Sequence, residues 1–85
     1  WGLIWKAVED AALMDEANAL AQKLAGGPTL GYGLTKRAIQ AASGHSHDAA
    51  IDLERDLQRQ AGRSADYAEG VAAFLGKRAP NYKGR

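Results

Sequence analysis

The sequence predicts an all-α fold, in which a short extended N-terminal lead is followed by about four helices. Apolar residues recur three or four positions apart in four stretches of the chain, as they do on one face of a helix. Glycine or proline separates each of these stretches from the next. At 85 residues the chain has room for one small domain, which we expect to span residues 1–85.

The composition predicts a thin hydrophobic core. Alanine supplies 18 of the hydrophobic residues, whereas Val, Ile, Leu, Met and Phe together supply only 16. A chain this short buries only ~60% of the surface that its unfolded form exposes. We therefore expect the fold to be completed by contact with another surface. The sequence contains no cysteine, which excludes disulfide bonds and thiolate metal sites and fits a cytoplasmic location.

Charge is balanced overall but uneven along the chain. A net charge of +1 gives no global field that would attract nucleic acid or an anionic membrane. No run approaches the ~20 apolar residues that a membrane span needs, so we expect neither of these partners. Beyond Glu69 every charged side chain is a cation: Lys77, Arg78, Lys83 and Arg85. The C-terminal tail is thus a local cationic patch.

The first two elements follow from short-range signals. The segment Leu3 to Val8 is short, apolar and bounded by Gly2 and an acidic pair, and we expect it to be extended. Asp10 belongs to the residue types that cap helix N-termini. Apolar residues at helical spacing then predict a first helix over about residues 11–25, which Gly26-Gly27 ends.

The second and third helices carry the clearest apolar stripes. Pro28 fits the first turn of a second helix that continues to Gly44, with a stripe of Leu30, Leu34, Ala38 and Ala41. Gly31 and Gly33 inside this helix weaken it by ~1 kcal/mol each relative to alanine. A third helix is predicted over residues 46–61, with a stripe of Ala50, Leu53, Leu57 and Ala61.

A fourth helix follows Gly62. Ser64 is a good N-cap for it, and Asp66 and Glu69 lie near its positive end. Its apolar residues are Tyr67, Val71, Phe74 and Leu75. Because Pro80 disfavours helical geometry at the residue before it, we expect this helix to fray near Arg78 and to give way to a polar tail.

Catalytic or metal chemistry has little support in the sequence. No signature pairs a nucleophile with a base, so we expect no catalytic residue within these 85 residues. His45, His47 and Asp48 could in principle bind a metal. A structural site normally needs four ligands, so we interpret them as a polar connection between helices and expect no metal. The Gly-rich stretch 26–33 lacks the lysine and hydroxyl spacing of a phosphate loop and punctuates helices instead.

The end of the fourth helix carries a more suggestive cluster. Phe74, Lys77 and Arg78 place one aromatic ring and two cations within five residues, which suits an adenine ring and its phosphates. On composition alone, however, the simpler interpretation is favoured. In that interpretation Phe74 belongs to the core, and the two cations are solvated at a helix C-terminus.

The stretch Asp66 to Arg78, DYAEGVAAFLGKR, resembles the C-terminal signature of the crotonase superfamily, the enoyl-CoA hydratases and isomerases. In that signature an acid and a Glu-Gly pair precede Ala-Phe-x-Glu-Lys-Arg. The likeness extends over essentially the whole chain, with further agreement at Gly2-Leu3-Ile4, Val8, Pro28 and Thr35-Lys36. Residues 52–58 and 62–67 are most similar to the epoxyphenylacetyl-CoA isomerase branch of phenylacetate breakdown.

The resemblance implies that the chain is the C-terminal helical domain of a larger crotonase-type enzyme acting on acyl-CoA thioesters. The catalytic core would lie before Trp1, and the isolated 85 residues would be inactive. The implied partners are that core, sister subunits in a trimer or hexamer, and acyl-CoA, whose coenzyme A moiety replaces any tightly bound cofactor. By motif position Phe74 would lie near the adenine and Lys77 near the nucleotide phosphates. Gly76 stands where the family usually has Glu. Because glycine is flexible, the resemblance does not define the residue at which the helix ends.

Two other classes of function remain open at this level. A stand-alone helical protein-interaction module would also explain apolar stripes on all four helices. A DNA-binding helix pair is disfavoured, because acidic residues interleave with the cations that would form it, in Thr35-Lys36-Arg37 and at Arg55 and Arg59.

Overall fold

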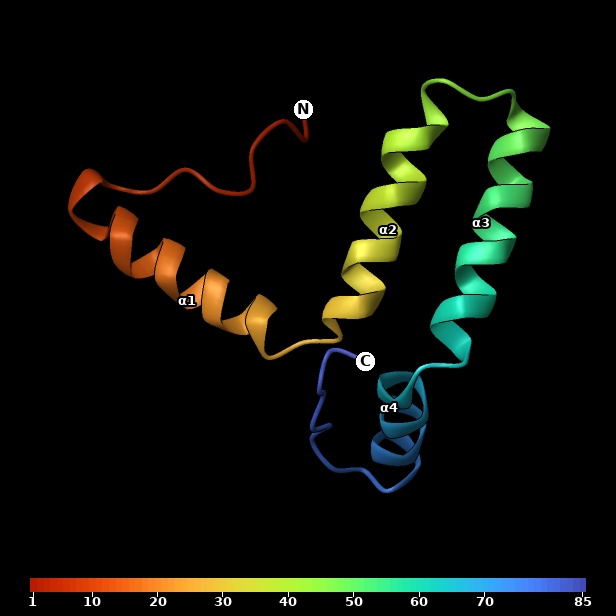
Figure 1. The fold of residues 1–85 in the computed structure, drawn as a ribbon. Helices are drawn as coiled ribbons and strands as arrows, with labels where there is room; N and C mark the ends of the chain where they lie inside the picture. Colours follow the sequence, from red (N-terminus) through yellow and green to blue (C-terminus); the bar gives the residue numbers. More distant parts are fainter.

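The computed structural model describes residues 1–85, and Figure 1 shows an all-helical chain without strands, as the sequence predicts. An extended lead, residues 1–9, precedes a 3-10 turn. The helical elements are η1 (Asp10–Ala12), α1 (Leu13–Ala25), α2 (Thr29–Ala42), α3 (His47–Gly62) and α4 (Ala65–Leu75). The predicted fold class is therefore confirmed.

Helices α2 and α3 form an antiparallel pair, which holds most of the small core (Figure 1). Their predicted stripes face each other: Leu34 and Leu57 are buried, and the other members of both stripes are half-buried. The turn between the helices ends at Ser46, whose hydroxyl oxygen accepts a hydrogen bond from the Ala49 amide at 3.3 Å. This N-cap satisfies one of the free donors in the first turn of α3.

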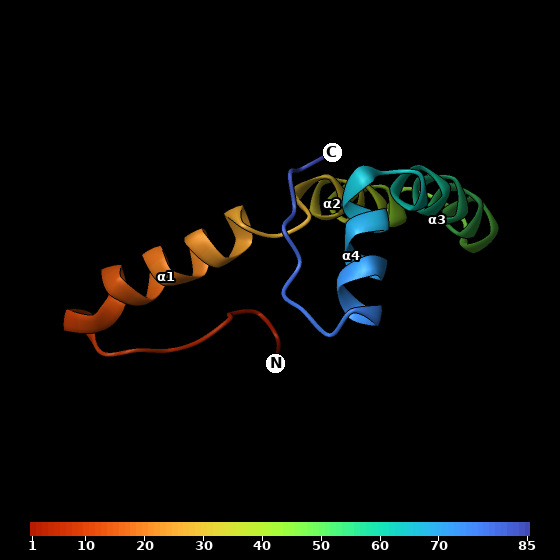
Figure 2. The same ribbon diagram turned by 90° about the horizontal axis from the view of Figure 1, so that it is seen from below.

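Helix α1 diverges from that pair, and the lead runs back beside it (Figures 1 and 2). The ammonium of Lys6 lies 2.9 Å from the Glu16 carboxylate and joins the lead to the helix. No residue of α1 is buried. Most of the large apolar residues of α1 and of the lead therefore remain exposed to solvent in this structure.

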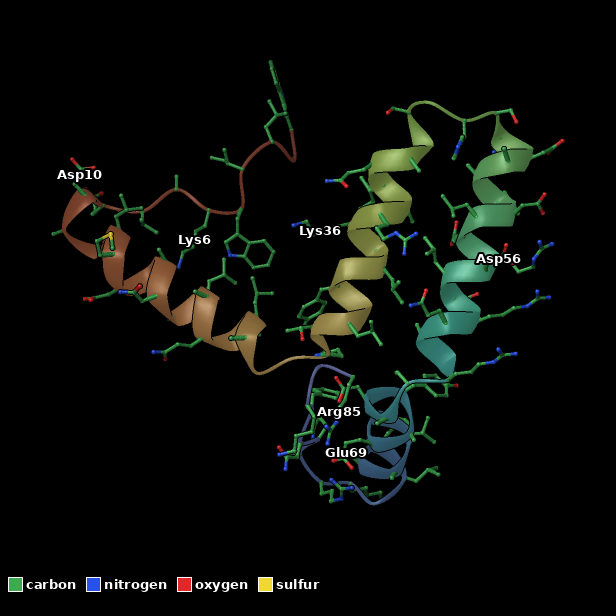
Figure 3. All side chains as sticks on the ribbon, viewed as in Figure 1. Lys6, Asp10, Lys36, Asp56, Glu69 and Arg85 are labelled. Atoms are coloured by element: carbon green, nitrogen blue, oxygen red, sulfur yellow. The ribbon has the colours of Figure 1, made fainter.

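The prediction that Asp10 caps the first helix is wrong. Asp10 lies inside η1, because the Ala12 amide donates to the Glu9 carbonyl at 2.9 Å and closes a 3-10 turn before α1 begins. Figure 3 shows Asp10 at this outer turn. Pro28 also differs slightly from its prediction. It is the N-cap residue of α2 and precedes the first turn, and its carbonyl accepts a hydrogen bond from the Tyr32 amide at 3.1 Å.

Helix α4 begins as predicted, with the Ser64 hydroxyl accepting a hydrogen bond from the Tyr67 amide at 3.0 Å. In α4 the face that carries the acidic residues is covered and the apolar face is exposed, whereas a surface helix usually buries its apolar face. The covered face carries Asp66, Glu69, Gly70 and Ala73, whereas the exposed face carries Tyr67, Val71, Phe74 and Leu75. The C-terminal tail, residues 76–85, returns along the covered face (Figure 2). The simpler interpretation of Phe74 as a core residue is thus wrong for this chain.

The molecule is open and flat. Its extents are 45 × 38 × 18 Å, and its radius of gyration is 16.1 Å, whereas a compact chain of this length has about 12 Å. Only four residues are buried: Leu34, Leu57, Asp66 and Ala73. The thin core expected from the composition is confirmed. None of the helices has the length and apolarity required to cross a membrane.

Candidate functional site

The two site residues expected from the sequence, Phe74 and Lys77, lie together at the C-terminal end of α4. The Lys77 amide donates to the Phe74 carbonyl at 3.2 Å, and the Arg78 amide donates to the Ala73 carbonyl at 3.0 Å. These two bonds form the Schellman motif that commonly ends helices. The helix therefore stops at Leu75, earlier than the fraying near Arg78 that Pro80 led us to expect. The turn itself, rather than the proline, ends it.

Lys77 occupies the position in this motif that usually belongs to glycine. Its φ is +50°, and no other non-glycine residue of the chain has a positive φ. For a residue with a Cβ, this left-handed conformation costs roughly 1–2 kcal/mol. Gly76 precedes it in a right-handed helical conformation, where an added Cβ would lie 3.1 Å from the Ala72 carbonyl oxygen. The departure from the usual Glu at this position thus coincides with a tight turn.

The ring of Phe74 is 82% exposed and borders an apolar groove of about 440 Å³. The exposed face of α4 forms one wall of this groove, and Pro28 and Gly31 at the start of α2 and Tyr82 of the tail also line it. A face made of Tyr67, Val71 and Phe74 combines flat aromatic surface with few polar atoms. Such a surface suits an aromatic ring or another apolar side chain.

Asp66 anchors the far end of the tail. Its carboxylate oxygens accept hydrogen bonds from the Lys83 amide at 2.7 Å and the Gly84 amide at 2.8 Å. Its own amide donates to the Arg85 carbonyl at 2.8 Å. Asp66 is only 3% exposed, and a buried carboxylate needs such donors to offset its lost hydration. Figure 3 shows Arg85 returning to the start of α4.

Glu69, one turn further along α4, anchors the near end of the tail. Its two carboxylate oxygens accept hydrogen bonds from the Arg78 guanidinium at 2.6 and 3.0 Å, and the Asn81 amide donates to it at 2.8 Å. The Arg78 hydrogen bond, with the Asn81 amide second, lowers the pKa of Glu69 to about 2. The same hydrogen bond raises the pKa of Arg78. Arg78 is therefore engaged within the chain, and of the two adjacent cations only Lys77 is free for a ligand.

The histidine cluster does not assemble into a metal centre. The structure brings together no group of three or more His, Cys, Asp or Glu side chains that could hold a metal ion. Ser46 between the two histidines is the N-cap of α3, and His47 is the first residue of that helix. The interpretation of this segment as a connection between helices is therefore right for His45 and Ser46, whereas His47 and Asp48 belong to the first turn of α3.

The likeness to known proteins extends beyond the C-terminal signature to the whole chain. A family model for enoyl-CoA hydratases and isomerases matches residues 1–85, the whole chain. The chain belongs to the enoyl-CoA hydratase/isomerase family. The resemblance found in the sequence is thereby confirmed.

The 1,2-epoxyphenylacetyl-CoA isomerase of Escherichia coli K12, a relative in this family, is 55% identical to this chain over 85 residues. The match covers 100% of this chain and 32% of the relative, so the chain spans about a third of that protein's length. The finer resemblance to the epoxyphenylacetyl-CoA isomerase branch is confirmed at this level of similarity.

Solved structures give the same fold assignment. A Mycobacterium abscessus protein assigned to the enoyl-CoA hydratases/isomerases superposes with a TM-score of 0.94 at 33% identity, over 100% of this chain and 33% of that one. An enoyl-CoA hydratase of Geobacillus kaustophilus gives 0.83 at 37% identity, over 88% and 28%. In each case this family member corresponds to a helical third of the larger protein.

Sequence reasoning missed the tail anchors of this family member. Asp66 and Glu69 looked like acids placed for the helix dipole, whereas they bind the tail. Their spacing of three puts both carboxylates on one face of α4, and the following segment carries only cations. That combination was the available signal. It could not identify backbone amides as the main donors, because these depend on how the tail turns.

Proposed function

We propose that the chain is the C-terminal helical domain of an enoyl-CoA hydratase/isomerase acting on acyl-CoA thioesters. The whole-chain family match supports this, together with the coverage of only about a third of the relatives. The reacting centre would then lie in the rest of the enzyme. This domain would contribute contacts to coenzyme A and to neighbouring subunits rather than the catalytic groups.

The observation that carries the proposal is the orientation of α4. The helix covers its polar face with its own tail and exposes its apolar face, including Phe74 at 82% exposure. An apolar helix face this open is normally covered by a partner. In our proposal the catalytic core and sister subunits, assembled as a trimer or hexamer, cover most of the exposed apolar surface.

The coenzyme A contact is proposed for the turn at the end of α4. Phe74 offers an exposed ring on which an adenine could stack, and Lys77 offers an unpaired cation three residues later for the nucleotide phosphates. Both groups would bind the nucleotide end of the substrate. This end is remote from the thioester, so these residues should affect binding more than the chemical step.

Lys77→Glu in the full-length enzyme tests this role. We expect the KM for the acyl-CoA substrate to rise about tenfold, because an attraction to phosphate becomes a repulsion, while kcat stays close to that of the wild type. The measurement is steady-state turnover of the acyl-CoA substrate over a range of concentrations. An unchanged KM with a collapsed kcat would contradict the proposed role.

A matched control separates local from general charge effects. Lys36→Glu makes the same charge reversal on α2, away from the end of α4 (Figure 3). We expect its KM to remain within about twofold of the wild type, because exposed charges beyond a Debye length are screened. Equal effects of the two reversals would indicate a general electrostatic influence rather than a phosphate contact.

The similarity to 1,2-epoxyphenylacetyl-CoA isomerase favours an isomerase of phenylacetate degradation as the finer proposal. The absence of cysteine fits a cytoplasmic location for this enzyme. The alternative is a stand-alone helical protein-interaction module, which the exposed apolar stripes would also serve. Light scattering and NMR distinguish the two. A strict monomer in which coenzyme A causes no shift of the Phe74 or Lys77 resonances would favour the interaction module.

A further inference from the structure

The last turn of α4 and the start of the tail form a closed unit around Glu69. Both terminal nitrogens of Arg78 donate to its carboxylate, Nη1 to Oε1 at 2.6 Å and Nη2 to Oε2 at 3.0 Å. The Asn81 amide donates to Oε1 at 2.8 Å. Three donors from two tail residues therefore converge on one carboxylate whose side chain is only 25% exposed.

Lys77 lies inside this unit, directly before Arg78. A non-glycine residue in the left-handed region persists only where its surroundings over-determine the conformation. Here the backbone of Arg78 is held by its bond to the Ala73 carbonyl, and its side chain is held by Glu69. Because both the main chain and the side chain of Arg78 are held, Arg78 restrains the backbone of Lys77, the residue before it.

We propose that Glu69 is a positioning residue for acyl-CoA binding: it holds Arg78, and thereby the left-handed turn from which the Lys77 side chain extends toward the nucleotide phosphates. This inference rests on the proposed function. Glu69 itself does not touch the ligand, because Arg78 and Asn81 occupy its carboxylate. Asp66 anchors the far end of the tail separately, at Lys83 and Gly84. Loss of Glu69 therefore acts on the turn near Lys77 and leaves the far end docked.

A double-mutant cycle in the full-length protein tests the coupling. The dissociation constant of coenzyme A is measured by calorimetry for the wild type, Glu69→Gln, Lys77→Ala and the double variant. We expect about a fivefold rise for Lys77→Ala and about a threefold rise for Glu69→Gln, since the cation is retained but less well placed. In the Lys77→Ala background the Glu69 substitution should have no further effect.

The outcomes separate this inference from the proposed function. If Lys77→Ala leaves the dissociation constant unchanged, the proposed coenzyme A contact fails, and this inference fails with it. If Lys77→Ala weakens binding but Glu69→Gln does not, only the positioning role is overturned. It is overturned too if Glu69→Gln weakens binding equally with and without Lys77, because the effect then does not pass through the lysine.

Two further variants guard against a simple folding defect. Arg78→Gln breaks the same ion pair from the tail side and should reproduce the threefold effect of Glu69→Gln. Glu54→Gln makes the matched substitution on the exposed surface of α3 and should leave the dissociation constant unchanged. If Glu69→Gln unfolds the protein by circular dichroism, Arg78→Gln with and without Lys77→Ala takes its place in the cycle.

Discussion

At the scale of single residues, two carboxylates decide the shape of the C-terminus. Asp66 receives two backbone amides and Glu69 receives a guanidinium and a third amide. Hydrogen bonds in which one partner is charged are stronger than those between neutral groups. A ten-residue tail without regular secondary structure can therefore hold one conformation.

The lowered pKa of Glu69 predicts how the tail responds to acid. Its pKa is lowered from 4.5 to about 2 by the Arg78 hydrogen bond and the Asn81 amide. Because the folded-state pKa is depressed, the contribution of this ion pair to stability is fully present above about pH 4.5 and is lost as the pH falls through about 2. We expect the Asn81 amide resonance of the full-length protein to keep its chemical shift down to about pH 3.

The Glu69→Gln variant is the control for that titration. It carries no ionisable group at this position, so the low-pH change at Asn81 should disappear. A midpoint near 4.5 in the wild type would instead show that the ion pair does not persist in solution.

At the scale of elements, α4 and α2 show two different relations between sequence pattern and packing. Periodicity predicts the apolar stripe of α2, and in the structure this stripe packs against α3. The stripe of α4 is just as regular, but the tail takes the opposite face, and Tyr67 and Phe74 remain exposed. Periodicity identifies which face is apolar, but it does not identify what covers that face.

The glycines inside α2 allow a test of helix stability. No atom lies within 4 Å of a Cβ built on Gly33. We expect Gly33→Ala to stabilise the helix by ~0.5–1 kcal/mol, because alanine loses less backbone entropy on folding. The measurement is the urea midpoint of the full-length protein.

Gly70→Ala is the matched comparison. A Cβ at Gly70 would lie 3.2 Å from the Tyr82 hydroxyl on the tail, so this substitution should bring no gain in the urea midpoint. A loss of stability in Gly33→Ala would mean that another part of the enzyme packs closely against this position.

At the scale of the whole molecule, the exposed surface is too large for a self-sufficient fold. The accessible area is 7131 Å², whereas a compact protein of 9.0 kDa has about 4,900 Å². The excess of about 2,200 Å² exceeds what one partner buries in a standard interface, ~800 Å². In our proposal, contact with other subunits and with the larger core covers this excess.

This excess predicts how the isolated 85 residues behave. We expect them to bind the dye ANS and to unfold with low cooperativity, because their apolar faces have no cover. We also expect no hydration of crotonyl-CoA. Dye fluorescence, thermal circular dichroism and a hydration assay measure these properties. Robust turnover, or sharp cooperative unfolding of a monomer, would contradict the proposed dependence on the rest of the enzyme.

The sequence by itself determined the four helices, the apolar stripes of α2 and α3, the cap at Ser64, and the family, because these depend on spacing and residue type within short segments. Only the tertiary structure decided the covered face of α4, the turn at Lys77 and the anchors at Asp66 and Glu69. Those features depend on where the tail folds back, and that path is set by hydrogen bonds to backbone amides. Nearly every residue has a backbone amide, so the amino-acid sequence does not indicate which amides donate to the two carboxylates.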